Sequence, residues 1–248
     1  MSDWHHISFR PNRLALLAAA AVAVGCGSDA TSPVTSPDAL LLNSAQVTSL
    51  DSSARVMVNA NPGDGNLKAL LDSTLLVLAS GVEAKRLDVT TDVTTAPLYF
   101  VGVHRVVTHS TGSFSTWTLV GIDDPSHLAN LVEVSGFARS GTGTAPTSVT
   151  GTIGDGTGVV NALFLKVGAA GAVTEWFANS GSVAFSSDAA TTACPSGVVA
   201  PNLTCALETM HVHFSANAPT GTGGAGARQA AIATDMAVPT LRLTFTGS

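Results

Sequence analysis

Charged and aromatic side chains are scarce in this chain of 248 residues. Asp, Glu, Lys and Arg together make up 11% of it, against about 25% in an average soluble protein. Acidic residues outnumber basic ones and the net charge is −6, while Phe, Trp and Tyr make up only 5%. A chain without a basic cluster or an aromatic platform lacks the usual means of binding nucleic acid. We therefore expect no nucleic-acid partner.

The apolar run from Leu14 to Gly25 is too short to span a membrane, which takes roughly 20 residues. Arg10 and Arg13 give the segment before it a positive charge. A basic segment followed by a short apolar run is typical of a secretory signal peptide. We expect an exported protein whose signal peptide covers residues 1–25.

The segment Ala23-Val24-Gly25-Cys26 resembles the lipobox of bacterial lipoproteins, although the family usually has Leu or a β-branched residue where Ala23 stands. The resemblance implies cleavage before Cys26 and attachment of lipid to it. The alternative is an ordinary secretory signal with an incidental cysteine. Residues 27–38 are rich in Ser, Thr, Pro and Gly, a composition that favours a solvated tether. We assign 26–45 to this tether and 46–248 to a single β-rich domain.

Only three cysteines are present. If Cys26 carries lipid, Cys194 and Cys205 remain as a pair, and an oxidising compartment favours a disulfide between them. Closing a loop this short would stabilise the fold by about 2–3 kcal/mol on the chain-entropy model. No Cys-x-x-Cys spacing accompanies the pair, so we do not expect a zinc site there.

Alternation of apolar and polar residues is the dominant pattern. It is clearest at 173–177, 209–215 and 240–246, and we expect further strands at 97–107, 115–120, 132–138, 147–153, 158–167, 182–186 and 228–237, with others near 54–60, 74–79 and 86–92. Helix is expected only over 124–131, with Asp124 as its N-cap, while 66–79 fits a helix or a strand. The predicted fold is all-β: an antiparallel β-sandwich or barrel-like domain with at most one or two short helices.

Catalytic motifs are missing: no G-x-S-x-G, S-x-x-K or H-E-x-x-H occurs. Gly221 to Gly226 matches G-x-G-x-x-G, but no strand–helix context surrounds it, and we interpret it as a hairpin loop. The oxygen-rich segment 59–66 lacks calcium-loop spacing and is interpreted as a turn. For Trp117 and Trp176, packing in the core is favoured over lining a sugar site.

His211 and His213 are the best candidates for a metal site. Alternation places both imidazoles on one face of a strand, which suits a pair of zinc or copper ligands. The competing interpretation, which we favour, has Met210, Val212 and Phe214 filling the core while both histidines face solvent.

These observations favour a lipid-anchored protein of the bacterial cell envelope, on the periplasmic or outer-membrane face. Its β domain would act in binding, adhesion or structure, without catalysis and without a cofactor. Its expected contacts are the membrane, through lipid on Cys26, and a protein or glycan that the sequence does not identify. One alternative is an envelope hydrolase or metal-dependent enzyme using His211 and His213; another is an accessory subunit of a membrane complex.

The lipobox yields a direct prediction. Replacing Cys26→Ser removes the only thiol to which the lipid would be attached, so the variant should leave the membrane fraction or accumulate unprocessed. Fractionation of cells grown with labelled fatty acid measures both outcomes. Equal membrane retention of the two forms, with label in neither, would contradict lipidation.

Overall fold

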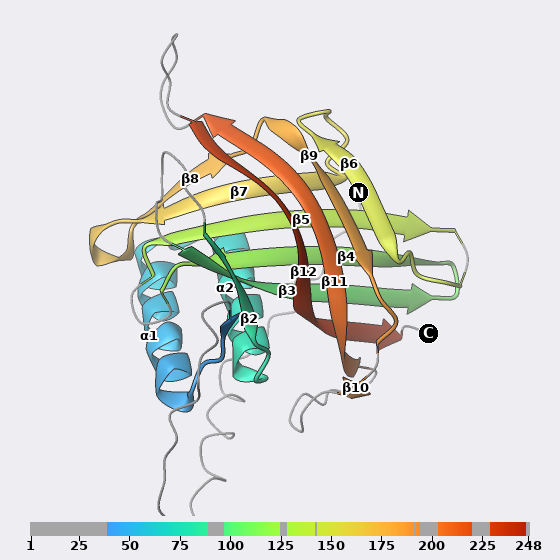
Figure 1. Cartoon of the computed structure of the whole chain (residues 1–248), viewed down its shortest axis with the longest axis horizontal. Coiled ribbons are helices and arrows are strands. Elements are labelled where there is room, and N and C mark those ends of the chain that lie inside the picture. Colours follow the sequence, from blue (N-terminus) through green and yellow to red (C-terminus); the bar gives the residue numbers. More distant parts are fainter. Residues whose placement is uncertain are drawn as a thin grey trace, which may run out of the picture. The chain divides into compact units, whose positions relative to one another are not determined.

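A twelve-stranded mixed sheet forms most of this computed structural model (Figure 1). The structure describes residues 39–88, 97–124, 128–141, 143–190, 192–193, 203–219 and 229–246, all within the compact unit Thr35–Ser248. Along its main path the strand order is β6-β9-β11-β12-β3-β4-β5-β7-β8. Strand β1 pairs with β2, β2 also pairs with β3, and β10 pairs with β11. The predicted β-rich, barrel-like architecture is thus confirmed.

The strands differ widely in length. They are β1 (Ala39–Leu40), β2 (Ala84–Asp88), β3 (Pro97–His109), β4 (Gly112–Ile122), β5 (Asn130–Ser140), β6 (Ser148–Ile153), β7 (Val160–Val167), β8 (Val173–Phe177), β9 (Ser180–Ser187), β10 (Thr192–Ala193), β11 (Leu203–Pro219) and β12 (Gln229–Thr246). Neighbours pair antiparallel except β12 and β3, which run parallel. The expectation of a purely antiparallel fold was therefore wrong at this one pair.

The sheet curls into a half-barrel whose interior is filled by side chains. We call this interior the inner cluster; it includes Leu98, Phe100, Trp117, Leu119, Val132, Phe164, Val183, Phe185, Met210, Val212 and Phe214. Gly136 of β5 lies where β5 approaches β6 and β9 across the interior, because a Cβ there would lie 2.8 Å from both Val149 of β6 and Phe185 of β9. Only a residue without a side chain permits this approach. Trp117 is fully buried, as predicted for a packing role, and Trp176 packs half-buried against the same cluster.

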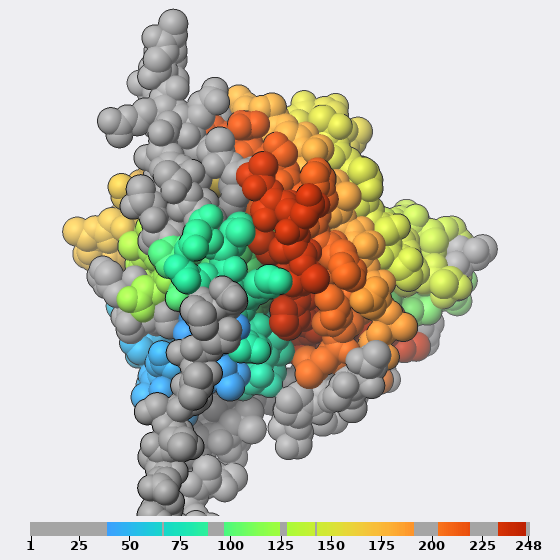
Figure 2. Space-filling model, viewed as in Figure 1, coloured from blue at the N-terminus to red at the C-terminus, as the bar shows by residue number. Residues whose placement is uncertain are grey.

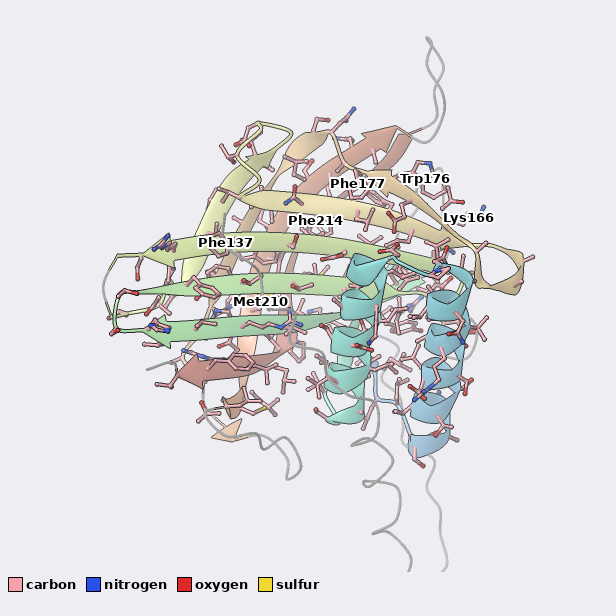
Figure 3. All side chains as sticks on the ribbon, turned by 180° about the vertical axis from the view of Figure 1, so that it is seen from behind. Phe137, Lys166, Trp176, Phe177, Met210 and Phe214 are labelled. Atoms are coloured by element: carbon pink, nitrogen blue, oxygen red, sulfur yellow. The ribbon has the colours of Figure 1, made fainter. Side chains whose placement is uncertain are left out.

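Two α-helices cover part of the opposite face of the sheet. They are α1 (Ser44–Ala60) and α2 (Gly65–Ala79), and a 3₁₀ turn lies at Ala169–Gly171. Beneath them lies a second core, the helix-side cluster, which includes Leu50, Met57, Leu67, Leu71, Leu78, Val101, Val103, Val120, Leu165, Leu241 and Leu243. Figure 3 shows both helices packed against one half of β3–β5 and the other half uncovered by them.

Helix α1 corrects the strand predicted near 54–60. Leu50, Ala54 and Met57 are its buried residues, a spacing of four and three that matches one face of a helix. The helix begins with a capping box, in which the Asn43 side chain accepts from the Gln46 amide and Gln46 bonds back. Because α1 starts at Ser44, the folded part begins before the expected boundary between residues 45 and 46.

Two further local expectations change. The segment 66–79 belongs to α2, so the helical alternative was right and the strand near 74–79 was wrong. Asn130 and Leu131 begin β5 instead of ending a helix, and residues 125–127 lie outside the described ones. It is the Asp123 carboxylate that organises this turn, by accepting from the Asp124 and Ala129 amides.

Candidate functional site

The side of β6, β9, β11 and β12 that faces away from the inner cluster carries two rows of side chains, in each of which three of the four residues are polar. Strand register places Thr150, Ala184, His213 and Asp235 side by side in one row. The neighbouring row consists of Ser148, Ser186, His211 and Ala237. Figure 2 shows this face, with β11 and β12 in orange to red beside β9 and β6 in lighter orange and yellow.

The orientation predicted for the two histidines is confirmed. Met210, Val212 and Phe214 are buried in the inner cluster, while the His211 and His213 side chains are 51% and 58% exposed. Neither imidazole stands alone, however. Each ring lies at the surface beside a carboxylate, and the alternation pattern could not reveal that neighbour.

Those carboxylates belong to Asp188 and Asp235. The His211 Nε2 atom lies 3.1 Å from Asp188 Oδ2, and His213 Nδ1 lies 2.6 Å from Asp235 Oδ1. In each pair the carboxylate holds one ring nitrogen and so orients the ring, leaving the other nitrogen for a ligand or for water. Both rings stand on the same strand, β11.

A shallow, open groove of about 540 Å³ runs over these rows. Its lining includes Ser148, Thr150, Ser186, His211, His213 and Asp235, with the strand residues Phe185, Val212 and Met236 between them. Hydroxyl, imidazole and carboxylate groups together supply both donors and acceptors. The groove therefore presents hydrogen-bonding groups over a surface several strands wide.

A second polar cluster is buried in the core. His104 Nδ1 lies 2.7 Å from Glu208 Oε1, and both side chains are at most 1% exposed. The His104 ring stacks on Trp117 with 4.8 Å between ring centroids, and the Trp117 indole donates to Ser187 Oγ at 3.0 Å. Arg242 approaches the other Glu208 oxygen at 3.6 Å. Sequence reasoning missed this cluster.

The cluster does not have the geometry of a Ser-His-acid triad. In a triad the acid and the serine occupy opposite ring nitrogens of the histidine. Here Ser187 Oγ lies 3.5 Å from His104 Nδ1, the same atom that Glu208 occupies. This cluster is an internal polar contact between distant strands.

Charged groups also lie between the helices and the sheet. Burial raises the pKa of Glu133 and lowers the pKa of Arg105, and the attraction between the two groups opposes both shifts. Arg105 donates to Ser73 of α2. Burial also raises the pKa of Glu175, and a hydrogen bond and repulsion from Asp64 add to it. Asp64 is the N-cap of α2, where its side chain accepts from the Leu67 amide at 2.9 Å.

Several predicted residues lie outside the described ones. These are Cys26, Cys194 and the glycine-rich segment 221–226, so lipidation and the disulfide stay predictions. Cys205 lies half-buried on β11 against the helix-side cluster. The glycine-rich segment connects β11 to β12, which pair as an antiparallel hairpin, so no helix follows it as a dinucleotide site would need. Among the described residues, no three His, Cys, Asp or Glu side chains gather as metal ligands would.

The exposed histidine pair yields a stability prediction. Because both rings face solvent, replacing His211→Gln together with His213→Gln should change the free energy of unfolding by only about 0.5 kcal/mol. The melting temperature of both proteins should also be indifferent to a chelator. A chelator-sensitive melt that disappears in the double variant would instead identify bound metal, since ligand loss would cost several kcal/mol of linked stability.

The raised pKa of Glu175 predicts how stability depends on pH. The folded protein holds this proton to higher pH than the unfolded chain, whose carboxyl titrates near its ordinary value of 4.5. Stability should therefore fall as pH rises from 4.5 through the raised pKa. Thermal melts of Glu175→Gln should show a weaker fall and a higher melting temperature than wild type at pH 7. The exposed residue Glu83 supplies the control; an equal effect of Glu83→Gln would contradict the assignment.

Comparison with known proteins adds no relative. No family model, curated protein or solved structure matches this chain. Within the described part of the chain, neither helix has the length and apolar character needed to cross a membrane. What the protein does must therefore be inferred from its own residues, and the outer groove is the candidate functional site.

Proposed function

We propose that this chain is a lipid-anchored protein of the bacterial cell envelope whose β domain binds an uncharged polar ligand, such as a glycan, without converting it. The binding surface in this proposal is the outer groove over β6, β9, β11 and β12. The signal-like segment and the lipobox resemblance at Cys26 support the location. The two registered rows of polar side chains are the observation that carries the binding function.

A glycan suits the groove because of its hydrogen-bonding chemistry. Sugar hydroxyls donate and accept, which matches a surface of serine and threonine hydroxyls, imidazoles and a carboxylate. Strands lie about 4.8 Å apart, so a row across four strands spans roughly 14 Å. An extended chain lying across the strands would contact successive side chains of one row.

The charge of the groove favours an uncharged ligand. Asp188 and Asp235 hold negative charge beside the two imidazoles, and both carboxylates are more than 60% exposed. An anionic polymer would be repelled by these groups, while a neutral sugar can donate hydroxyl hydrogens to them. Hydrogen bonds to a charged acceptor are the stronger kind, at about 1.5–3 kcal/mol each.

Calorimetric titration with a panel of neutral and acidic oligosaccharides tests the proposal. Wild type should bind a neutral oligosaccharide, and Asp235→Ala should weaken that binding roughly 10–100-fold, because one charge-assisted hydrogen bond is lost and His213 loses its support. The variant His109→Gln is the matched control, since His109 is exposed at the end of β3, away from the groove.

Three results would decide against this function. One is that no neutral sugar in the panel binds. Another is that the acidic sugars bind more tightly than the neutral ones. The third is that Asp235→Ala and His109→Gln have equal effects on the dissociation constant.

A further inference from the structure

An aromatic patch occupies the part of the helix-bearing face that α1 and α2 leave uncovered. Strand register places Phe245, Val107, Phe114 and Arg139 in one row across β12, β3, β4 and β5. The adjacent row is Leu243, Arg105, Thr116 and Phe137. We call Val107, Phe114, Phe137 and Phe245 the aromatic patch; Figure 3 shows Phe137 on the half of β5 away from the helices.

The patch is a surface feature. Phe137 is 37% exposed, and the other three side chains are half-buried. Phe114 and Phe137 lie against each other, with 5.8 Å between ring centroids and an interplanar angle of 42°. Exposed clusters of large apolar side chains mark contact surfaces more often than single ones do.

The exposed charge on the patch strands is a base. Arg139 stands exposed at the end of the first row, whereas Arg105, at the helix side of the second row, is half-buried, donates to Ser73 and lies near Glu133. The strand segments that carry the patch, 105–109, 112–116, 135–140 and 243–246, contain no Asp or Glu. In a chain with a net charge of −6, these strand segments combine aromatic residues with an exposed base, Arg139, and no acid.

The described part of the chain begins beside the helix-side cluster. Leu40, two residues into the described structure, packs against the helix-side cluster, and Leu41 beside it is 39% exposed. Between Cys26 and Ala39 lie residues 27–38, whose fully extended length is at most about 45 Å. A lipid on Cys26 would therefore keep the membrane within reach of the aromatic patch at high effective concentration.

We propose that the aromatic patch rests on the surface of an anionic membrane and so orients the anchored domain, with the outer groove directed elsewhere. Phenylalanine side chains enter the boundary between headgroups and acyl chains, and arginine attracts anionic headgroups. A second copy of the chain is a poorer occupant, because a two-fold contact through this patch would bring the exposed Arg139 of both copies into one interface. The inference rests on the lipid anchor of the proposed function.

Fluorescence quenching by lipid tests this orientation. The acylated protein carrying Phe137→Trp is reconstituted with vesicles of phosphatidylglycerol and phosphatidylcholine brominated near the headgroup. A tryptophan at the patch should lose fluorescence to the bromine atoms. Phe177→Trp is the matched control, because Phe177 is 63% exposed but lies on β8, outside the patch. The native Trp117 is fully buried and Trp176 half-buried, and the wild-type protein, which has both, measures their background.

The expected result is a large loss of fluorescence in Phe137→Trp, little change in Phe177→Trp beyond wild type, and a smaller loss when Arg139→Glu is added. Equal quenching at the two positions would overturn the inference, as would self-association of the protein through the patch. Vesicle flotation separates the two proposals. If the protein floats with the vesicles but residue 137 is not quenched, the anchor is retained and only the membrane contact of the patch is refuted. If the protein does not float, both the anchor and the membrane contact of the patch are refuted.

Discussion

The hairpin of β11 and β12 is the constraint on which the rest of the structure depends. Its two strands pair without interruption from Leu203 and Phe245 to Pro219 and Gln229. At one end β12 continues into a parallel pairing with β3, and at the other β11 pairs with β9. The same hairpin therefore joins β9 and β6 on one side to β3, β4 and β5 on the other. Because it belongs to both parts of the sheet, the sheet curls around the inner cluster.

The same hairpin divides one face into two environments. On β11, Leu203, Cys205 and Leu207 lie against the helix-side cluster, while His211 and His213 on the same side are exposed. The strand keeps its alternation throughout, so the difference comes from what packs against each part of the face. Burial in the helix-side cluster selects apolar residues, and beyond that cluster the same face bears the polar rows of the groove.

How far the sequence predicts this structure can be judged from particular residues. Alternation at 209–215 was enough to place Met210, Val212 and Phe214 inside and both histidines outside, since period two is a local property of a strand. The helix over 44–60 had a readable signal in Asn43 and Gln46, but valines on alternate positions near its end suggested a strand. The strand propensity of those valines was overridden by the capping box and by the packing of one face of the helix.

The buried polar contact was beyond such reasoning. His104 and Glu208 are 104 residues apart, and they meet only because β12 lies between β3 and β11. Such a buried pair adds little net stability, because desolvation offsets the attraction between the partners. Its effect is on register: a slip of one residue in either strand would turn one partner to the opposite face and leave the other buried alone.

The parallel pairing of β3 with β12 also governs the order of assembly. Strand β3 is synthesised early, and along residues 102–108 its neighbour on one side is β12, the last strand that the structure describes. Until β12 arrives, that part of the β3 edge presents unpaired backbone groups to any other extended chain. Folding dominated by such distant pairings is slow, and its intermediates are prone to aggregate. In the exported protein proposed here, translocation can begin before β12 is synthesised. The sheet is then still open, and the chain can cross the membrane in an extended form. Late closure of the sheet is therefore compatible with export in an unfolded state.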